Sequence, residues 1–242
     1  MNQCDYCGRE DPEEATHCGG CGKVLLRETE AVEPLAGSEA ADWIIRAFRW
    51  ALEQYGADVF CHRTELITPT REHFPDVPGD PAQRVASIFE RIKTYAGMKD
   101  WACKLVAQGP DVNPVVDPLT VVENAPHGPA GTFSMAGAEP AIAQITYNPD
   151  SVRDPMALVA MLAHELAHYL GQAASEPPPG GEKNWEFATD LTAVYMGFGF
   201  FLCNAAVRFR QFTGIGNQGW VTRRLGYLSE FELTYCLAVF VR

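Results

Sequence analysis

The stretch Met156-Ala-Leu-Val-Ala-Met-Leu-Ala-His164-Glu165-Leu-Ala-His168-Tyr-Leu170 organises the rest of the chain. It is apolar enough for a buried helix, and it contains the pattern His-Glu-x-x-His. Two histidines four residues apart on a helix lie on one face, close enough to bind a single metal ion. Glu165 lies beside that pair, where it can polarise a metal-bound water molecule.

The flanking residues predict where this helix begins and ends. Asp154 is a favourable N-cap, Pro155 is favourable in the first turn, and Gly171 ends the helix. Residues 173–183 then contain three consecutive prolines and two glycines, which predict a loop.

A second helix is expected over residues 184–204. It places Glu186 and Asp190 four residues apart, on one face. Glu186 can then complete the metal shell, while Asp190 accepts a hydrogen bond from the far nitrogen of a histidine ligand. Three protein ligands with one open position are typical of a catalytic zinc site.

Other interpretations of these residues stay open. The two histidines could be ordinary core residues whose polar atoms are satisfied by hydrogen bonds. Asp190 could bind the metal, with Glu186 beside it. Glu176 and Glu182, in the loop, are weaker ligand candidates.

At these residues the chain resembles the gluzincin metallopeptidases, the thermolysin-like class. The resemblance spans residues 143–204 and implies that His164, His168 and Glu186 bind zinc, that Glu165 is the general base and that Asp190 orients a histidine. It implies an α+β, zincin-like fold with a small sheet and active-site helices. It also implies that the strand before the catalytic helix, residues 143–147, pairs through an exposed edge with extended peptide substrate.

The family uses a downstream His or Tyr to stabilise the oxyanion, but no histidine follows His168. That role falls to a tyrosine or an arginine near the C-terminus. Tyr195 is a poor candidate, because on an ideal helix it lies about half a turn round from Glu186. The candidates are Tyr227, Tyr235, Arg223 and Arg224.

The N-terminus predicts a second metal site. Two Cys-x-x-Cys pairs, each followed by glycine, have the spacing of a four-thiolate structural zinc site and resemble a zinc ribbon over residues 1–26. His17 is expected to be a spectator, and a redox dithiol is the less favoured alternative. The expected ligands are Cys4, Cys7, Cys18 and Cys21.

Composition limits the partners. The chain has 242 residues, 47% of them hydrophobic, and a formal net charge of −12. This charge disfavours nucleic acid and anionic membranes. The acidic residues around the ribbon favour a possible protein partner for it, and the family resemblance implies a peptide or protein substrate. We find no secretory signal pattern and expect a cytoplasmic location.

The single cysteines 61, 103, 203 and 236 are expected to be reduced and mostly buried.

The remaining elements follow from periodicity. After a linker at residues 27–40, the main domain is expected over residues 41–242. His62, His73 and His127 are expected to be structural or solvated. Helices are expected at 41–55, 81–96 and 229–241, strands at 102–108, 119–123 and 143–147, and a proline-rich loop at 67–78.

The uncharged run 191–207 raises the question of a membrane span, but glycines, Thr192 and Asn204 interrupt it, which favours a buried core helix.

From the His-Glu-x-x-His helix and the family resemblance we predict a zinc-dependent metallopeptidase. The alternative is an inactive, zinc-stabilised scaffold or regulatory protein that binds a partner through the ribbon. A DNA-associated protease is the least favoured prediction, given the acidic composition.

Overall fold

The computed structural model divides the chain into two compact units, Met1–Pro34 and Leu35–Arg242. The larger unit combines helices with a small mixed sheet, so the predicted α+β class is confirmed at this level. The described residues are 2–3, 9–12, 15, 18–21, 36–76, 78–109, 131–136, 142–214, 217–224 and 226–242, with the backbone alone described at 2–3, 136 and 207–224.

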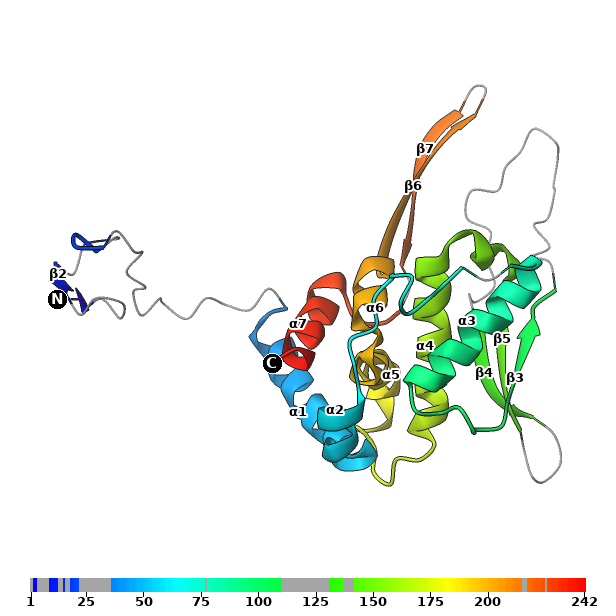
Figure 1. Ribbon diagram of the computed structural model, residues 1–242, viewed down its shortest axis with the longest axis horizontal. Coiled ribbons are helices and arrows are strands. Elements are labelled where there is room, and N and C mark those ends of the chain that lie inside the picture. Colours follow the sequence, from blue (N-terminus) through cyan, green and yellow to red (C-terminus); the bar gives the residue numbers. More distant parts are fainter. Residues whose placement is uncertain are drawn as a thin grey trace. The chain divides into compact units, whose positions relative to one another are not determined.

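The elements of the larger unit are shown in Figure 1. In chain order they are α1 (Ser38–Tyr55), α2 (Ala57–Arg63), α3 (Pro81–Tyr95), β3 (Cys103–Ala107), β4 (Gly131–Ala136), β5 (Ile142–Tyr147), η1 (Pro149–Arg153), α4 (Pro155–Gly171), η2 (Glu182–Asn184), α5 (Trp185–Ala193), η3 (Val194–Phe198), α6 (Gly199–Ala205), β6 (Val207–Gly214), β7 (Asn217–Arg224) and α7 (Glu230–Phe240).

Helix α4 is central to this unit: α5 and α6 pack on one side of it, and α3, β4 and β5 pack on the other (Figure 1). It begins as predicted, because the Asp154 side chain accepts a hydrogen bond from the backbone N–H of Ala157 at 3.2 Å and Pro155 occupies the first turn. Between Leu158 and Ala167 every residue except His164 is buried. A helix that is apolar all round must be enclosed in this way.

The sheet lies against α4 and has the strand order β3-β5-β4. β5 pairs with β3 in parallel and with β4 in antiparallel fashion. The expectation that residues 143–147 present an exposed edge is therefore wrong, because β5 is hydrogen-bonded on both sides. The strand that borders α4 at the sheet edge is β4. There a side chain on Gly131 would collide with the sulfur of Met161 and the carbonyl of Thr146.

Helices α1 and α3 confirm the predictions from helical spacing. Ile44 and Phe48 of α1 are buried, as are Val85 and Phe89 of α3. α3 begins with a reciprocal capping box in which Asp80 and Gln83 satisfy each other's backbone N–H groups. Helix α7 has the predicted box as well, formed by Ser229 and Glu232.

The single helix predicted over residues 184–204 is broken. α5 passes into a π-helical turn, η3, in which Gly197 has φ 98°, and α6 continues beyond it. The Gly197 carbonyl accepts a hydrogen bond from the Ile67 N–H at 2.9 Å. A side chain at Gly197 would run into the Glu65 carbonyl, so the break lets residues 65–67 pack closely.

The apolar second half of that segment is buried in the core, as expected. Among the helices that the structure describes, none is both long enough and apolar enough to span a bilayer. The hairpin β6–β7 that follows α6 was not predicted. Figure 1 shows it projecting from the helices.

The remaining predictions are in part untested, in part wrong and in part confirmed. Residues 119–123, His127, His17, Cys4 and Cys7 lie outside the described residues. The four single cysteines are not mostly buried: only Cys236 is, because Cys61 lies on an exposed part of α2 and the other two are partly exposed. His62 is exposed, and His73 is bound by Thr68 and Thr70, in agreement with solvated and structural roles.

In the smaller unit, β1 (Asn2–Gln3) pairs with β2 (Glu10–Asp11). Cys18 is buried, and the Gly20 N–H donates to its sulfur at 3.4 Å. This approach of a backbone amide to the sulfur is the one expected for a metal-binding knuckle.

Replacing Gly197 with alanine is expected to destabilise the protein by about 3 kcal/mol, because it adds both left-handed strain and a backbone clash. Gly97 is the matched control: its φ is 70°, but no atom lies within 4 Å of the position that an added methyl group would occupy. Gly97→Ala should cost only about 1 kcal/mol. Urea unfolding of both variants measures the difference; equal costs would contradict the clash.

Candidate metal centre

Three side chains from two helices converge on one point. His164 and His168, one turn apart on α4, have their Nε2 atoms 3.2 Å apart. Glu186, in the first turn of α5, places Oε2 at 3.7 Å from the first Nε2 and 3.3 Å from the second. Among the described residues this is the one group of three or more His, Cys, Asp or Glu side chains that could hold a metal ion.

The opposite ring nitrogens fix how the two histidines are protonated. His164 Nδ1 lies 2.8 Å from Asp190 Oδ1, and because a carboxylate only accepts, Nδ1 is the donor. Thr189 donates its hydroxyl to the Trp185 carbonyl at 2.8 Å, which leaves its oxygen to accept from His168 Nδ1 at 3.4 Å. With both Nδ1 atoms donating, each ring in its neutral form has its Nε2 lone pair on the side of Glu186.

Three electron-pair donors that face one another at this distance repel unless a proton or a metal ion lies between them. A proton on His164 Nε2 can bridge to only one neighbour, and Glu186 Oε2 is buried without a hydrogen bond. Ligand atoms at tetrahedral angles around a first-row divalent ion are about 3.3–3.5 Å apart. The observed separations of 3.2, 3.3 and 3.7 Å therefore fit a metal ion bound by all three atoms.

Asp190 ties this centre to the chain beyond the hairpin. It is 1% exposed, and its Oδ2 accepts hydrogen bonds from the backbone N–H groups of Tyr227 at 2.6 Å and Leu228 at 2.8 Å. Gly226, with φ 88°, makes this approach possible, since a side chain there would lie 2.9 Å from Oδ2. The same carboxylate thus orients His164 and positions Tyr227.

Helix α1 fixes the loop that joins the two ligand-bearing helices. The indole N–H groups of Trp43 and Trp50 donate to the carbonyls of Pro179 and Glu176 at 2.8 and 3.0 Å. Gln54 accepts from the backbone and hydroxyl of Ser175. The loop is therefore held at three points, and with it the start of α5, which carries Glu186.

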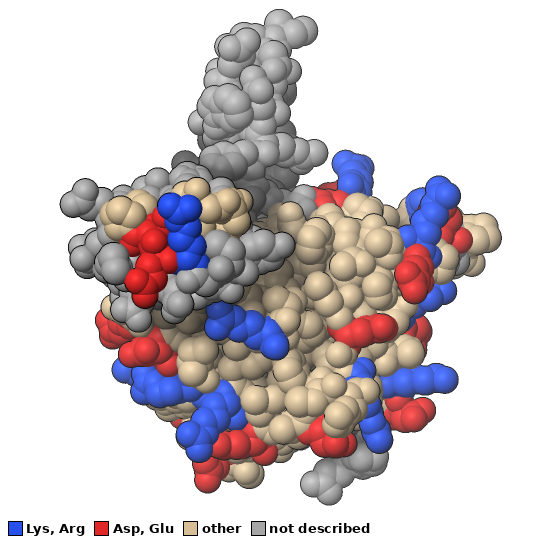
Figure 2. Space-filling view, turned by 60° about the vertical axis from the view of Figure 1, so that its left-hand side comes forward, with Lys and Arg blue, Asp and Glu red and all other residues tan. Residues whose placement is uncertain are grey.

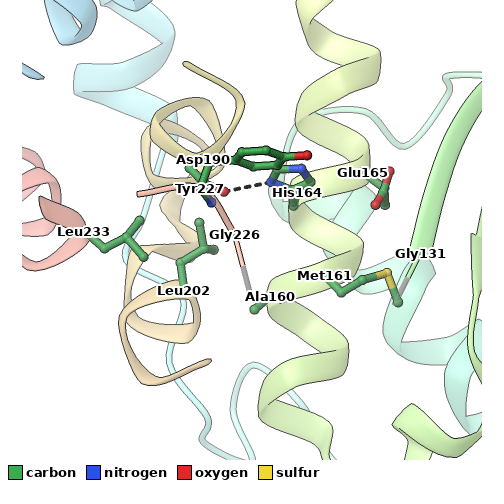
Figure 3. Close-up of a pocket in the computed structure, with 10 residues that line it drawn as sticks. All are labelled: Gly131, Ala160, Met161, His164, Glu165, Asp190, Leu202, Gly226, Tyr227 and Leu233. Carbon is green, nitrogen blue, oxygen red and sulfur yellow. Dashed lines mark hydrogen bonds and ion pairs between the residues drawn. The ribbon is translucent and has the colours of Figure 1, made fainter. Parts of the chain in front are cut away.

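Glu165 is buried at 7% exposure and lines the same cavity as His164. Figure 3 shows its carboxylate on the side of α4 toward Met161 and Gly131. Burial raises the pKa of Glu165 to about 7, opposed by His164 and reinforced by the charge of Glu186. A carboxylate of this kind accepts and returns a proton near neutral pH.

The two histidines and Glu186 shift one another's pKa values. Burial by itself would lower the pKa of His164, but Asp190 and Glu186 outweigh it and raise the pKa to about 10. Burial and the neighbouring His164 lower the pKa of His168. The His164 interaction lowers the pKa of Glu186. A metal ion that binds here must therefore displace a proton from His164.

A cavity of about 180 Å³ adjoins the two helices. Apart from His164, Glu165 and Asp190, its lining is mostly apolar, and Tyr227 forms part of its wall. The Tyr227 ring stacks on His164 with centroids 6.2 Å apart and lies across it in Figure 3. Phe133 of β4 stacks on His168 at the same centroid distance. Aromatic rings thus cover both histidines of the cluster.

The structure separates the candidates that the sequence left open. Asp190 lies on the Nδ1 side of His164, so the three-atom cluster has Glu186 rather than Asp190 as its acid. Glu176 is exposed, and Glu182 accepts from the Trp185 indole at 2.7 Å.

Among the oxyanion candidates, Tyr227 is the one that the structure brings to His164. Tyr235 packs against the core from α7, and Tyr195 donates to the Gly56 carbonyl at 2.8 Å. Arg223 and Arg224 lie on β7, where only the backbone is described.

Sequence reasoning missed Thr189, Phe133 and Gly226. Thr189 follows the α5 spacing, three residues after Glu186, and could have been found from it. Phe133 and Gly226 depend on tertiary contacts, which no local pattern encodes. Comparison of the chain with protein-family models, curated proteins and solved structures finds no match in any of the three.

Removing the Asp190 carboxylate is expected to weaken zinc binding. Asp190→Ala should lower the affinity by about 10- to 100-fold. Asp190→Asn tests the protonation argument: the amide oxygen can still accept from the backbone, but its NH₂ would face Nδ1 and favour a proton on Nε2. It should lose at least as much affinity, as measured by competition with a chromophoric chelator.

Glu176→Gln is the control, because it removes an exposed carboxylate from the neighbouring loop. Its zinc affinity should equal that of the parent chain. Unchanged affinity in both Asp190 variants would show that this residue does not support the ligand.

Proposed function

We propose that the chain is a zinc-dependent metallopeptidase. The observation that carries this proposal is the convergence of His164 Nε2, His168 Nε2 and Glu186 Oε2, with Oε2 buried and lacking a hydrogen bond. Beside them lies a buried carboxylate, Glu165, in a cavity that a substrate side chain could enter.

The donor set favours zinc over other ions. Two imidazoles and one carboxylate suit Zn²⁺, whereas Mg²⁺ and Ca²⁺ prefer shells made of oxygen atoms. The support of His164 by Asp190 and of His168 by Thr189 is also what a zinc-binding histidine requires, because it fixes the ring tautomer. Three protein ligands leave one position for substrate or water.

Zinc bound at these residues supplies Lewis acidity, which polarises a carbonyl and makes a water molecule acidic. Glu165 accepts the proton of the attacking water at its carboxylate as the new C–O bond forms. It then delivers that proton to the leaving nitrogen as the C–N bond breaks, so the residue returns to its starting charge. Its burial keeps bulk water away from this transfer.

Tyr227 supplies the donor for the developing oxyanion in this proposal. Its ring lies over His164, and its backbone is fixed by Asp190. The charges of Glu186, Asp190 and Glu165 raise the pKa of the phenol, which keeps it protonated at neutral pH. A protonated hydroxyl beside the ligand cluster is able to donate a hydrogen bond to an oxyanion.

The smaller unit is proposed to be a zinc ribbon whose metal is structural. Cys18 and Cys21 form one knuckle, supported by the amide of Gly20. A site closed by four thiolates has no open position and performs no chemistry. Together with the zincin-like unit this gives two zinc ions per chain.

The variant Glu165→Gln is expected to keep its zinc and lose hydrolysis by at least about 100-fold, because a general base contributes that much or more. Mass spectrometry of a mixed peptide pool measures cleavage, and atomic absorption measures metal content. A chelator should abolish cleavage by the parent chain, and added zinc should restore it.

Equal cleavage by the variant and the parent chain would remove Glu165 from the mechanism. Two zinc ions per chain with no cleavage of any peptide would instead favour the scaffold interpretation.

Replacing the phenol should affect turnover rather than metal binding. Tyr227→Phe is expected to lower kcat/KM by about 100- to 1,000-fold, as for loss of an oxyanion donor. The side chain is 49% exposed, so folding should be unaffected. Tyr235→Phe, on α7, is the control and should retain full activity; steady-state kinetics with one cleaved peptide measures both variants.

A further inference from the structure

The hairpin β6–β7 differs in charge from the rest of the chain. The protein has 31 acidic residues and a net charge of −12, yet residues 191–229 contain no acidic residue. The same stretch contains four arginines, all in the hairpin, which we call the arginine collar: Arg208, Arg210, Arg223 and Arg224.

Strand register brings these residues together. Arg208 and Arg223 are direct cross-strand partners, and Arg210 is two positions along β6 on the same face. Arg224 pairs with Val207 on the opposite face. Like charges directly opposed across two strands destabilise a sheet, and a bound anion would relieve that repulsion.

The collar lies at the end of the hairpin nearest the metal centre. Its residues fall within the four cross-strand pairs closest to α6, whereas the outer pairs, from Gln211 with Trp220 onward, carry no charge. Arg224 is only three positions before Tyr227, so their Cα atoms are at most about 11 Å apart. That is close to the Debye length of about 8–10 Å at physiological salt.

On the face shown in Figure 2, the Lys and Arg residues coloured there are interspersed with Asp and Glu. An anionic molecule is therefore repelled by the protein as a whole and attracted at the collar, which raises its concentration beside the cavity.

We propose that the arginine collar binds acidic residues of the peptide substrate, so that the metal centre acts on acidic polypeptide segments. This proposal rests on the proposed peptidase function. The placement of the arginines favours a peptide over a nucleic acid, because a nucleic-acid arm needs cations along its length to follow the phosphates. Here they are confined to the end beside the site.

Binding can be tested separately from cleavage. The zinc-loaded full chain carrying Glu165→Gln is titrated into two fluorescein-labelled dodecapeptides, one alternating Glu and Ala and the other alternating Lys and Ala. Fluorescence anisotropy should show the acidic peptide bound at least about tenfold more tightly, with an affinity that falls as salt is raised.

In the same background, the triple variant Arg208→Ser, Arg210→Ser, Arg223→Ser should lose about tenfold in affinity for the acidic peptide. The matched control removes three exposed cations away from the hairpin, by Arg63→Ser, Arg84→Ser and Lys99→Ser, and should bind like the parent. If the triple variant does not fold, Arg208→Ser and Arg223→Ser are measured singly, and each should weaken binding.

Equal binding by the triple variant and its control overturns the proposal. So does tighter, collar-dependent binding of a single-stranded oligonucleotide or of phosphatidylserine vesicles, which would assign the collar to another class of partner. If the acidic peptide binds through the collar but the parent chain, which retains Glu165, does not hydrolyse it, the collar proposal is supported. Only the peptidase function is then contradicted.

Discussion

The Asp190 carboxylate is the interaction on which the rest of the centre depends. A buried charge is stable only when its oxygens are hydrogen-bonded, and this one accepts from an imidazole and from two backbone amides. Through these bonds α4, α5 and the segment before α7 meet at one side chain. The orientation of the His164 ring and the position of Tyr227 therefore depend on the same group.

Sequence reasoning succeeded where local physics decides. Rules that relate residues three or four positions apart were sufficient for the helix termini and for the helix faces. They account for the N-cap at Asp154, the capping boxes of α3 and α7, and the buried faces of α1 and α3. The convergence of Glu186 on the two histidines follows from helical spacing, provided that the two helices pack together. Their apolar faces make that packing the expected result.

It failed where tertiary contact decides. β4 shows no clear alternation, and its place beside α4 depends on Gly131 meeting Met161. The break at Gly197 depends on a hydrogen bond to Ile67, which no helix pattern encodes. The hairpin register, which opposes Arg208 and Arg223, was also unpredicted. A net charge of −12 concealed a local excess of cations, because net charge carries no information about position.

Helix α1 holds the loop between α4 and α5 in place. The smallest part of the chain that can fold as an independent unit must therefore include α1. Residues 143–204 contain His164, His168 and Glu186, but Trp43, Trp50 and Gln54, which hold the loop before Glu186, lie about a hundred residues earlier. The Asp190 amide donors lie beyond the hairpin, at Tyr227 and Leu228. An excised segment would keep these three side chains and lose their geometry, so the transferable unit for engineering or for tracing ancestry runs from α1 to α7.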